Sequence, residues 1–363
     1  MRRTGWPSGA AARIRVWVRV ALFGLFGLLG LPVARAIIVF GSGDPAHNTT
    51  PPSGSLTNSG WHWQGRWQFA LGTVIGPRQF VTARHLGGTV GDGFEFRGLR
   101  YRTVAVTQRP GTDLQVFTVA GRFSDFAPLN TNTREGGRPL MLLGRGGRRG
   151  EPVGGRGWWV GDYDGVQRWG TNTVKGVVPA NLSPVGDLLV FDFSETAGAD
   201  EGCYSGGDSG AGNFMLDRDG VWKLAGVGYA VEGPYTANTN TAPRYGALFD
   251  TRALWAGQPG AQEWLPDGPT PTGTLGFMTR ISSHAAWLTL QASTQPVPGQ
   301  PILESSPDLA GVFAEESAYA VDGDQRRVQV PVSSNTRFFR IRGGSRLQLL
   351  SIEAGVCSLQ FDW

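Results

Sequence analysis

The stretch GCYSGGDSGAGNF, residues 202–214, places Ser209 among glycines and directly after the acidic Asp208. Gly, Ser and Asp are common in tight turns, because they supply positive φ angles and side-chain hydrogen bonds to the backbone. The same residues suit a nucleophilic serine. Such a serine needs a base within hydrogen-bond reach, a carboxylate that orients the base, and backbone N–H donors for an oxyanion. The rest of the chain has to distinguish a turn from a site.

The composition favours an all-β chain with more than one domain. The chain has 363 residues, of which 40% are hydrophobic and 17% are charged, with 55 Gly, 23 Pro and 13 Trp. A chain of this length exceeds one ordinary core, and its many turn residues and few long helix-forming runs are typical of short strands. The formal net charge is only +4, which is weak support for an anionic partner.

The first 36 residues have the order of a secretory signal. Several arginines precede the 14-residue apolar run VALFGLFGLLGLPV, and the small-x-small sequence ARA follows at residues 34–36. The alternative is a permanent membrane anchor, but a spanning helix needs about 20 apolar residues. We expect a signal peptide over residues 1–36, an exported protein whose mature chain begins near Ile37, and no stable membrane anchor after cleavage.

One of the four histidines stands at the end of a predicted strand. Residues 71–88, LGTVIGPRQFVTARHLGG, favour a β-hairpin that turns at Gly76 and Pro77, with QFVTA as its second strand and His85 just beyond it. A strand end is a rigid platform for a catalytic base. His47, His62 and His284 lie in ordinary surface or half-buried contexts.

A carboxylate precedes the next apolar strand. Asp113 comes directly before LQVFTV, where a turn or strand-start aspartate is the simpler interpretation. The chain order His85, Asp113, Ser209 is nevertheless the order of chymotrypsin and not that of subtilisins or α/β-hydrolases. An α/β-hydrolase is also disfavoured because GGDSGAG lacks the full G-x-S-x-G pattern.

From about residue 37 to 265 the chain resembles the trypsin/chymotrypsin-like serine peptidase family. FVTARHL resembles the family's T-A-A-H strand, TDLQVFTV its D-I-A-L strand, and GGDSGAG its G-D-S-G-G motif. DGVWKLAGVGYAVEG is similar to the hairpin after the nucleophile, and APRYGALFDTRALW to the segment that leads to a terminal helix. The resemblance implies a chymotrypsin-like double β-barrel that needs no metal or organic cofactor and acts on polypeptides.

The resemblance also implies roles for single residues. Ser209 would attack the carbonyl, His85 would transfer the proton, and Asp113 would hold the imidazole. The backbone N–H groups of Gly207 and Ser209 would form the oxyanion hole. The strand formed by Gly228, Tyr229 and Ala230 would pair with the substrate backbone.

Three further expectations concern the specificity pocket and the new amino terminus. Cys203 would lie at the base of the pocket, which favours a neutral or apolar side chain before the scissile bond, although Asp200 and Glu201 lie near enough in sequence to reach in. Asp208 would pair with the amine of Ile37, since cleavage after ARA leaves IIVFG. Signal cleavage itself would then activate the enzyme.

The sequence departs from the family pattern in several places. Arg84 stands where alanine is usual, and Ala211 replaces the last glycine of the motif. The usual disulfide pairs are absent, because the chain has only Cys203 and Cys357. A bridge between these two cysteines is an open alternative. The interval from His85 to Asp113 is short, which predicts trimmed loops and a more open cleft.

A change of composition after Trp264 indicates a second region. Residues 266–275 are rich in Pro, Gly and Thr and are expected to be a linker. AWLTLQAS, QPILESS, RRVQVPVS and TRFFRIRGG are strand-like runs that predict a small β-sandwich module over residues 276–363, completed by the tail SRLQLLSIEAGVCSLQFDW. This region resembles a C-terminal β-module of exported bacterial proteins. Packing or attachment is its expected role, with carbohydrate or surface binding as the sharper alternative.

The sequence therefore predicts an exported, periplasmic or extracellular, serine endopeptidase. The principal alternative is a catalytically silent protein that keeps the peptidase fold to bind peptides or glycans. The arginine-rich stretch GRGGRRGEPVGGRG, residues 144–157, is similar to RGG-type segments that bind nucleic acids, which gives a third hypothesis for the function. Its flanks look like strands, so we expect a loop there and no nucleic-acid partner. The oligomeric state is open.

Overall fold

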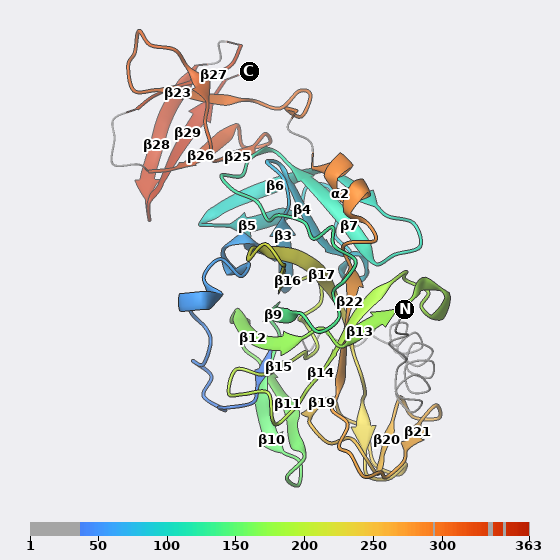
Figure 1. Ribbon diagram of the computed structural model, residues 1–363. Coiled ribbons are helices and arrows are strands. Elements are labelled where there is room, and N and C mark those ends of the chain that lie inside the picture. Colours follow the sequence, from blue (N-terminus) through green and yellow to red (C-terminus); the bar gives the residue numbers. More distant parts are fainter. Residues whose placement is uncertain (1–36, 293–294, 333–336, 344–345, 363) are drawn as a thin grey trace.

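A closed six-stranded barrel forms the first part of the fold (Figure 1). The computed structural model describes residues 37–292, 295–332, 337–343 and 346–362. Phenylalanines and Trp67 fill the barrel, because strands with apolar side chains on their inner faces exclude water when the sheet closes. The strand order is β2 (Gln64–Trp67), β3 (Ala70–Val74), β4 (Gln79–Ala83), β7 (Leu114–Val119), β6 (Leu99–Gln108) and β5 (Gly93–Phe96), which pairs again with β2.

A seven-stranded antiparallel sheet forms the second part and lies below the barrel in Figure 1. Asn172 on one edge strand donates a hydrogen bond of 3.0 Å to the carbonyl of Asp192, so the sheet curls into a half-barrel. The strand order is β12 (Arg168–Thr173), β9 (Pro139–Gly144), β16 (Gly212–Leu216), β17 (Trp222–Val231), β22 (Leu275–Arg280), β14 (Leu188–Asp192) and β13 (Gly176–Val178).

Shorter strands and turns surround the half-barrel. β1 (Ile38–Val39) pairs with β15 (Gly202–Cys203). Six further strands form two three-stranded sheets, β10 (Gly147–Pro152) with β11 (Gly157–Tyr163) and β19 (Gly246–Leu248), and β18 (Tyr235–Thr236) with β20 (Leu254–Ala256) and β21 (Glu263–Leu265). In the described residues, 3-10 turns span Gly54–Leu56, Trp61–Trp63, Arg84–Leu86 and Ala180–Leu182.

One hydrophobic core joins the barrel to the half-barrel. Leu71, Val81 and Leu114 of the barrel share it with Leu143 and Phe214 of the seven-stranded sheet. Burial of such side chains contributes about 1.5–3 kcal/mol each relative to exposure. The two parts are therefore held against each other, and their seam is the place where the predicted site residues meet.

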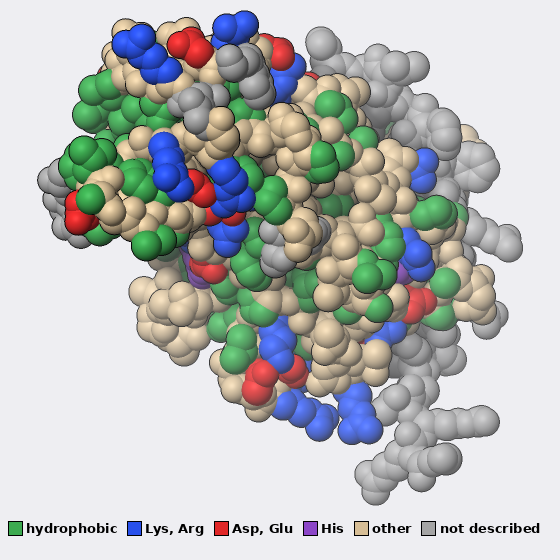
Figure 2. Space-filling view, turned by 90° about the horizontal axis from the view of Figure 1, so that it is seen from above, with side chains coloured by type: hydrophobic (Ala, Val, Ile, Leu, Met, Phe, Trp, Pro, Cys, Tyr) green, Lys and Arg blue, Asp and Glu red, His purple; other side chains and the backbone are tan. Residues whose placement is uncertain are grey.

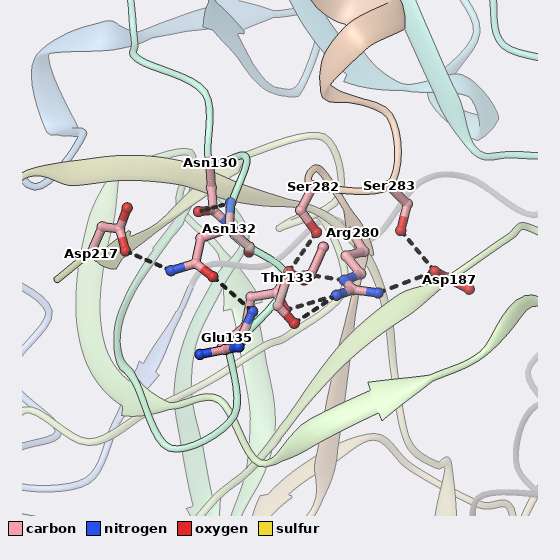
Figure 3. Close-up of polar contacts among 10 residues, drawn as sticks. Asn130, Asn132, Thr133, Glu135, Asp187, Asp217, Arg280, Ser282 and Ser283 are labelled. Atoms are coloured by element: carbon pink, nitrogen blue, oxygen red, sulfur yellow. Dashed lines mark hydrogen bonds and ion pairs between the residues drawn. The ribbon is translucent and has the colours of Figure 1, made fainter.

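A polar cluster ties the segment between the two parts to the end of β22 (Figure 3). The buried carboxylate of Glu135 accepts two hydrogen bonds from the guanidinium of Arg280, at 2.9 and 2.8 Å, and one of 2.5 Å from Ser282. Arg280 also reaches Asp187 at 3.2 Å. A bidentate arginine–carboxylate pair fixes both position and orientation, so this cluster holds the chain where it leaves the sheet.

The all-β prediction is confirmed, and two local predictions are wrong. The sequence predicts a first domain that ends at residue 265, a linker over residues 266–275 and a module that begins at residue 276. However, β22 spans Leu275–Arg280 and pairs with both β14 and β17 inside the seven-stranded sheet. AWLTLQAS was predicted as a strand, yet Ala285–Gln291 is the helix α2. Ala and Leu favour helices, and Ala285 and Leu288, three residues apart, face the core. APRYGALFDTRALW does not lead directly to a helix, because β20 begins at Leu254 inside it and β21 follows.

The C-terminal region consists of two packed sheets, as predicted for a small β-sandwich. Leu303 and Ile341 of one sheet share a core with Val328, Leu359 and Phe361 of the other. The first sheet has the order β24 (Ala314–Glu315), β23 (Leu303–Ser306) and β27 (Phe338–Ile341), and the second β28 (Leu347–Glu353), β29 (Val356–Phe361), β26 (Arg327–Pro331), β25 (Tyr319–Asp322) and β8 (Gly121–Arg122).

The last of these strands, β8, comes from the barrel part of the chain. Gly121 pairs with Ala320, and a Cβ atom on Gly121 would lie 2.2 Å from the carbonyl oxygen of Tyr319. Arg78, which is buried, contacts the carboxylate of Glu315. The pairing of β8 with β25 and the partly buried ion pair of Arg78 with Glu315 therefore join the module to the barrel part of the chain.

Two sequence predictions concern the amino-terminal segment and the two cysteines. The expected signal peptide, residues 1–36, lies outside the described residues. Within the described part of the chain, no helix has the length and apolar character needed to cross a membrane. Cys203 and Cys357 are both buried free thiols, so the open alternative of a bridge between them is not realised in this structure.

Candidate active site

The His85 turn follows β4 without a break. His85 lies in the 3-10 turn Arg84–Leu86 and is half-buried. Gly87 ends the turn with a φ of +69° and donates its N–H to the carbonyl of Arg84 at 3.0 Å. A positive φ favours glycine at this position. The strand β4 ends at Ala83, and His85 therefore lies at the seam between the barrel and the half-barrel.

Asp113 holds His85 by its backbone and by its ring. The Asp113 side chain is 5% exposed and lies just before β7. Its Oδ1 accepts the His85 backbone N–H at 2.9 Å, and its Oδ2 lies 2.6 Å from His85 Nδ1. A carboxylate at this distance favours a proton on Nδ1. The other ring nitrogen, Nε2, is then left as a proton acceptor.

The Ser209 turn packs against both ends of the His85 turn. Gly210, the next residue, has a φ of +80°, and a Cβ atom there would lie 2.3 Å from Thr82 Oγ1 and 2.6 Å from Leu86 Cδ1. Only glycine allows this approach, which brings the half-buried Ser209 beside the His85 turn. Among the described residues, no hydrogen bond joins the Ser209 hydroxyl to His85. Such bonds are often long in unliganded enzymes.

Two backbone N–H groups in the Ser209 turn donate to no acceptor in the described part of the protein. These are the N–H groups of Gly207 and Ser209, whereas Asp208, Gly210 and Ala211 donate to the carbonyls of Ser205, Gly228 and Asp208. Gly207 has a φ of +94°. Unpartnered N–H groups two residues apart can both be offered to one oxygen, as an oxyanion hole requires.

Asp208 is completely enclosed and is held by backbone donors. Its carboxylate accepts the N–H groups of Ser205 at 2.7 Å and Gly146 at 3.1 Å, and the Ser205 hydroxyl at 3.1 Å. Burial raises the pKa of Asp208 well above its usual value. No cationic side chain among the described residues pairs with it, so this carboxylate lacks a counter-charge.

Ile37 lies next to Asp208. Its side chain is 1% exposed. A Cβ atom on Gly144 would lie 2.0 Å from Asp208 Oδ1 and 3.0 Å from Ile37 Cγ1. Both groups therefore lie against the same glycine.

The strand β17 passes directly behind the Ser209 turn. A Cβ atom on Gly228 would lie 2.7 Å from the carbonyl oxygen of Asp208. The Tyr229 ring meets the His85 ring edge-on, with centroids 6.1 Å apart, and burial raises the pKa of Tyr229 to about 12, with a smaller contribution from Asp113. β16 pairs with β17 only as far as Val227. Past Gly228, the β17 edge opposite β22 pairs with no strand in the described residues.

Cys203 lies in a buried apolar cluster close to this strand. Its thiol is 0% exposed and packs with Ile38, Phe193 and Ala247, which surround it with apolar atoms. Burial raises the pKa of Cys203 well above its usual value, so the thiol stays neutral. Cys203 is closed off from solvent, so its place at the base of a specificity pocket stays a prediction.

The two acids near Cys203 in sequence have other partners. Asp200 accepts hydrogen bonds from Asn48 at 3.0 Å and contacts His47 Nε2 at 3.2 Å. Glu201 accepts from Asn172 at 2.9 Å and from the N–H of Ser194 at 3.3 Å. Neither carboxylate is therefore available to recognise a basic side chain next to Cys203.

The arginine-rich stretch is not a simple loop. Its flanks are the strands β9 and β11, as expected, but residues 147–152 form β10. Arg149 pairs opposite Val160, and its guanidinium lies 3.4 Å from the centroid of the Trp158 ring. Cation–π stacking of this kind holds an arginine in a strand, which explains why the loop predicted from the strand-like flanks is wrong for residues 147–152.

Two groups around the site escaped the sequence analysis. One is the pair of backbone donors at Arg145 and Gly146 that hold Asp208, which no side-chain motif reveals. The other is Gln115, whose side chain is 0% exposed. Its only signal in the sequence is a polar residue inside the apolar run LQVFTV.

Comparisons with known proteins give neighbours of the fold only. No protein-family model matches the chain, and no curated protein matches it. The structure of neuropsin, a serine protease expressed in the limbic system of mouse brain, is 12% identical with a TM-score of 0.40 and covers 65% of this chain and 96% of its own. The atomic-resolution structure of HBP is 14% identical with a TM-score of 0.38 and covers 67% and 96%. Values this low assign no activity to the chain.

Glu201 predicts a pH-dependent stability. Burial raises the pKa of Glu201 to about 8, so between about pH 4.5 and 8 the folded protein keeps a proton that the unfolded chain has released. The free energy of unfolding should therefore fall with rising pH in this window, by at most about 1.4 kcal/mol per pH unit from this group. Glu201→Gln should remove that slope.

Urea unfolding at several pH values between 5 and 8 measures this difference. The stability of Glu201→Gln relative to wild type should grow as the pH rises. Glu195→Gln, which removes an exposed carboxylate nearby, is the control and should follow the wild type. Parallel curves for wild type and Glu201→Gln would contradict the assignment of a protonated buried Glu201.

Proposed function

We propose that the protein is an exported serine endopeptidase that hydrolyses peptide bonds through an acyl-enzyme. The observation that carries the proposal is the His85–Asp113 contact of 2.6 Å, which leaves His85 Nε2 as a base beside the Ser209 turn. In this proposal Ser209 is the nucleophile, His85 the base and Asp113 the orienting carboxylate. The unpartnered N–H groups of Gly207 and Ser209 support the same role.

The reaction proceeds in two halves. Ser209 Oγ attacks the peptide carbonyl while His85 Nε2 takes its proton, and the new oxyanion is stabilised by the N–H groups of Gly207 and Ser209. Each such donor contributes on the order of 3 kcal/mol in the transition state. His85 then protonates the leaving amine, which leaves an acyl group on Ser209. Water, activated by His85, releases the acid and restores the serine.

The proposed substrate is an extended polypeptide. The β17 edge past Gly228 can pair with the substrate backbone as an added strand. The apolar surroundings of Cys203 and the engagement of Asp200 and Glu201 elsewhere favour a neutral or apolar side chain before the scissile bond. In this proposal no metal or organic cofactor takes part.

The remaining proposals concern export and partners. The order of charged, apolar and small residues in positions 1–36 supports a cleaved signal and a periplasmic or extracellular enzyme. On the face drawn in Figure 2, basic and acidic side chains are interspersed, which supports a polypeptide partner over nucleic acid. We propose that the C-terminal module packs against and supports the barrel to which β8 and β25 join it.

Labelling by a fluorophosphonate tests the nucleophile, because only an activated serine reacts. The mature protein should be labelled, and Ser209→Ala and His85→Ala should not be. Peptide turnover by Ser209→Ala should fall by on the order of 10⁶. Gel fluorescence and intact mass measure the label, and circular dichroism shows that each variant is folded.

Ser194→Ala is the control, since Ser194 lies outside the site and its hydroxyl contacts Thr196. It should be labelled like the wild type. A folded wild type that takes no label would overturn the peptidase proposal and favour the catalytically silent binding protein. The observation that favours this silent binding protein is that no hydrogen bond joins the Ser209 hydroxyl to His85 in the described residues.

The amine of Ile37 is proposed as the counter-charge of Asp208. Protein that begins at Ile37 should be active, and protein with one extra residue before Ile37 should lose activity, because the amine would no longer reach the buried carboxylate. The two forms, with their amino termini confirmed by mass spectrometry, are compared in the labelling assay. Equal labelling rates would show that Asp208 needs only its backbone donors.

A further inference from the structure

A single buried amide spans the His85 turn. Gln115 lies in β7 opposite Thr82, and its Nε2 donates to the carbonyl of Ala83 at 3.2 Å and to the carbonyl of Gly87 at 2.6 Å. Ala83 comes directly before the turn Arg84–Leu86, and Gly87 directly after it. One side chain therefore clamps both ends of the turn that carries His85.

The orientation of this amide follows from its partners. Both contacts are carbonyl oxygens, which only accept, so the side-chain nitrogen must face them. The other amide atom, Gln115 Oε1, is buried with no hydrogen-bond partner among the described residues. A buried acceptor without a partner is unfavourable for folding, so the glutamine is poorly explained by stability alone.

The clamp acts together with Asp113. The N–H of Arg84 donates to the backbone carbonyl of Asp113 at 2.8 Å, and the N–H and ring of His85 contact the Asp113 carboxylate. In the described part of the chain, the hydrogen bonds that hold the turn from this side come from Asp113, just before β7, and from Gln115 in β7. Asp113 holds the start of the turn and the imidazole ring. Gln115 also holds the end of the turn, through its hydrogen bond to the carbonyl of Gly87.

We propose that Gln115 is a positioning residue that holds the His85 turn against β7, so that the His85 ring stays in contact with the Asp113 carboxylate. Without the clamp, the end of the turn moves away from β7 and the contact between His85 and Asp113 loosens. The role in catalysis rests on the proposed function, but the positioning of the ring does not. The two can therefore be tested separately.

Gln115→Met tests the clamp, because methionine has a similar length and no donor. Proton NMR of the wild type should show a strongly deshielded His85 Nδ1–H resonance, as a short charge-assisted hydrogen bond produces. In Gln115→Met this resonance should move upfield or broaden. The fluorophosphonate labelling rate and kcat per folded molecule should fall about 10- to 100-fold with KM little changed, as expected for misplaced catalytic groups.

Gln79→Met is the matched control. Gln79 is also a buried glutamine, 3% exposed, but it lies at the opposite end of β4 from the His85 turn. It should change the unfolding midpoint without moving the resonance or lowering the labelling rate per folded molecule. An unchanged Nδ1–H resonance in folded Gln115→Met, or its absence from the wild type, overturns the positioning role. A wild type that has the resonance but takes no label would refute the peptidase and leave the clamp standing.

Discussion

The register of β4 against β7 is the constraint on which the site depends. Ala83 pairs with Leu114 at the end of these antiparallel strands. The residues just past one strand therefore face those just before the other, which brings His85 to Asp113. Packing on both faces of β4 fixes the register, because a slip by one residue would exchange Phe80, which lies in the barrel core, with Val81 and Ala83, which lie in the core shared with the half-barrel. The 2.6 Å contact between the ring and the carboxylate is thus a consequence of barrel packing and not of a local motif.

The other half of the site is held by close backbone approach. Gly210 lies against Thr82 and Leu86, and Gly228 lies against the carbonyl of Asp208, so the Ser209 turn is enclosed between the barrel and β17. The core shared by the barrel and the half-barrel keeps these surfaces together. Burial raises the pKa of Asp208 well above its usual value, and neutral donors alone hold its side chain directly behind the turn. The turn thus combines tight packing with a buried titratable group.

Much of the fold followed from the sequence where local signals were strong. The hairpin around Gly76 and Pro77 and the strand LQVFTV are β3, β4 and β7, because apolar β-branched and aromatic runs end at clear turn residues. β22 was missed because its lead-in is rich in Pro, Gly and Thr, and α2 because seven residues are too short to show a helical period. The clamp by Gln115 and the backbone donors to Asp208 depend on tertiary contacts. The docking of the module through β8 likewise has no local signature beyond Gly121.

We propose that barrel packing prepares His85, Asp113 and Ser209 for acyl transfer, and a crystal structure with a peptide boronate bound tests this proposal. We predict a tetrahedral boron bonded to Ser209 Oγ, one boronate oxygen between the N–H groups of Gly207 and Ser209, and His85 still in contact with Asp113. At a saturating concentration of the boronate, a structure with Ser209 unmodified and the peptide absent from β17 would contradict the account.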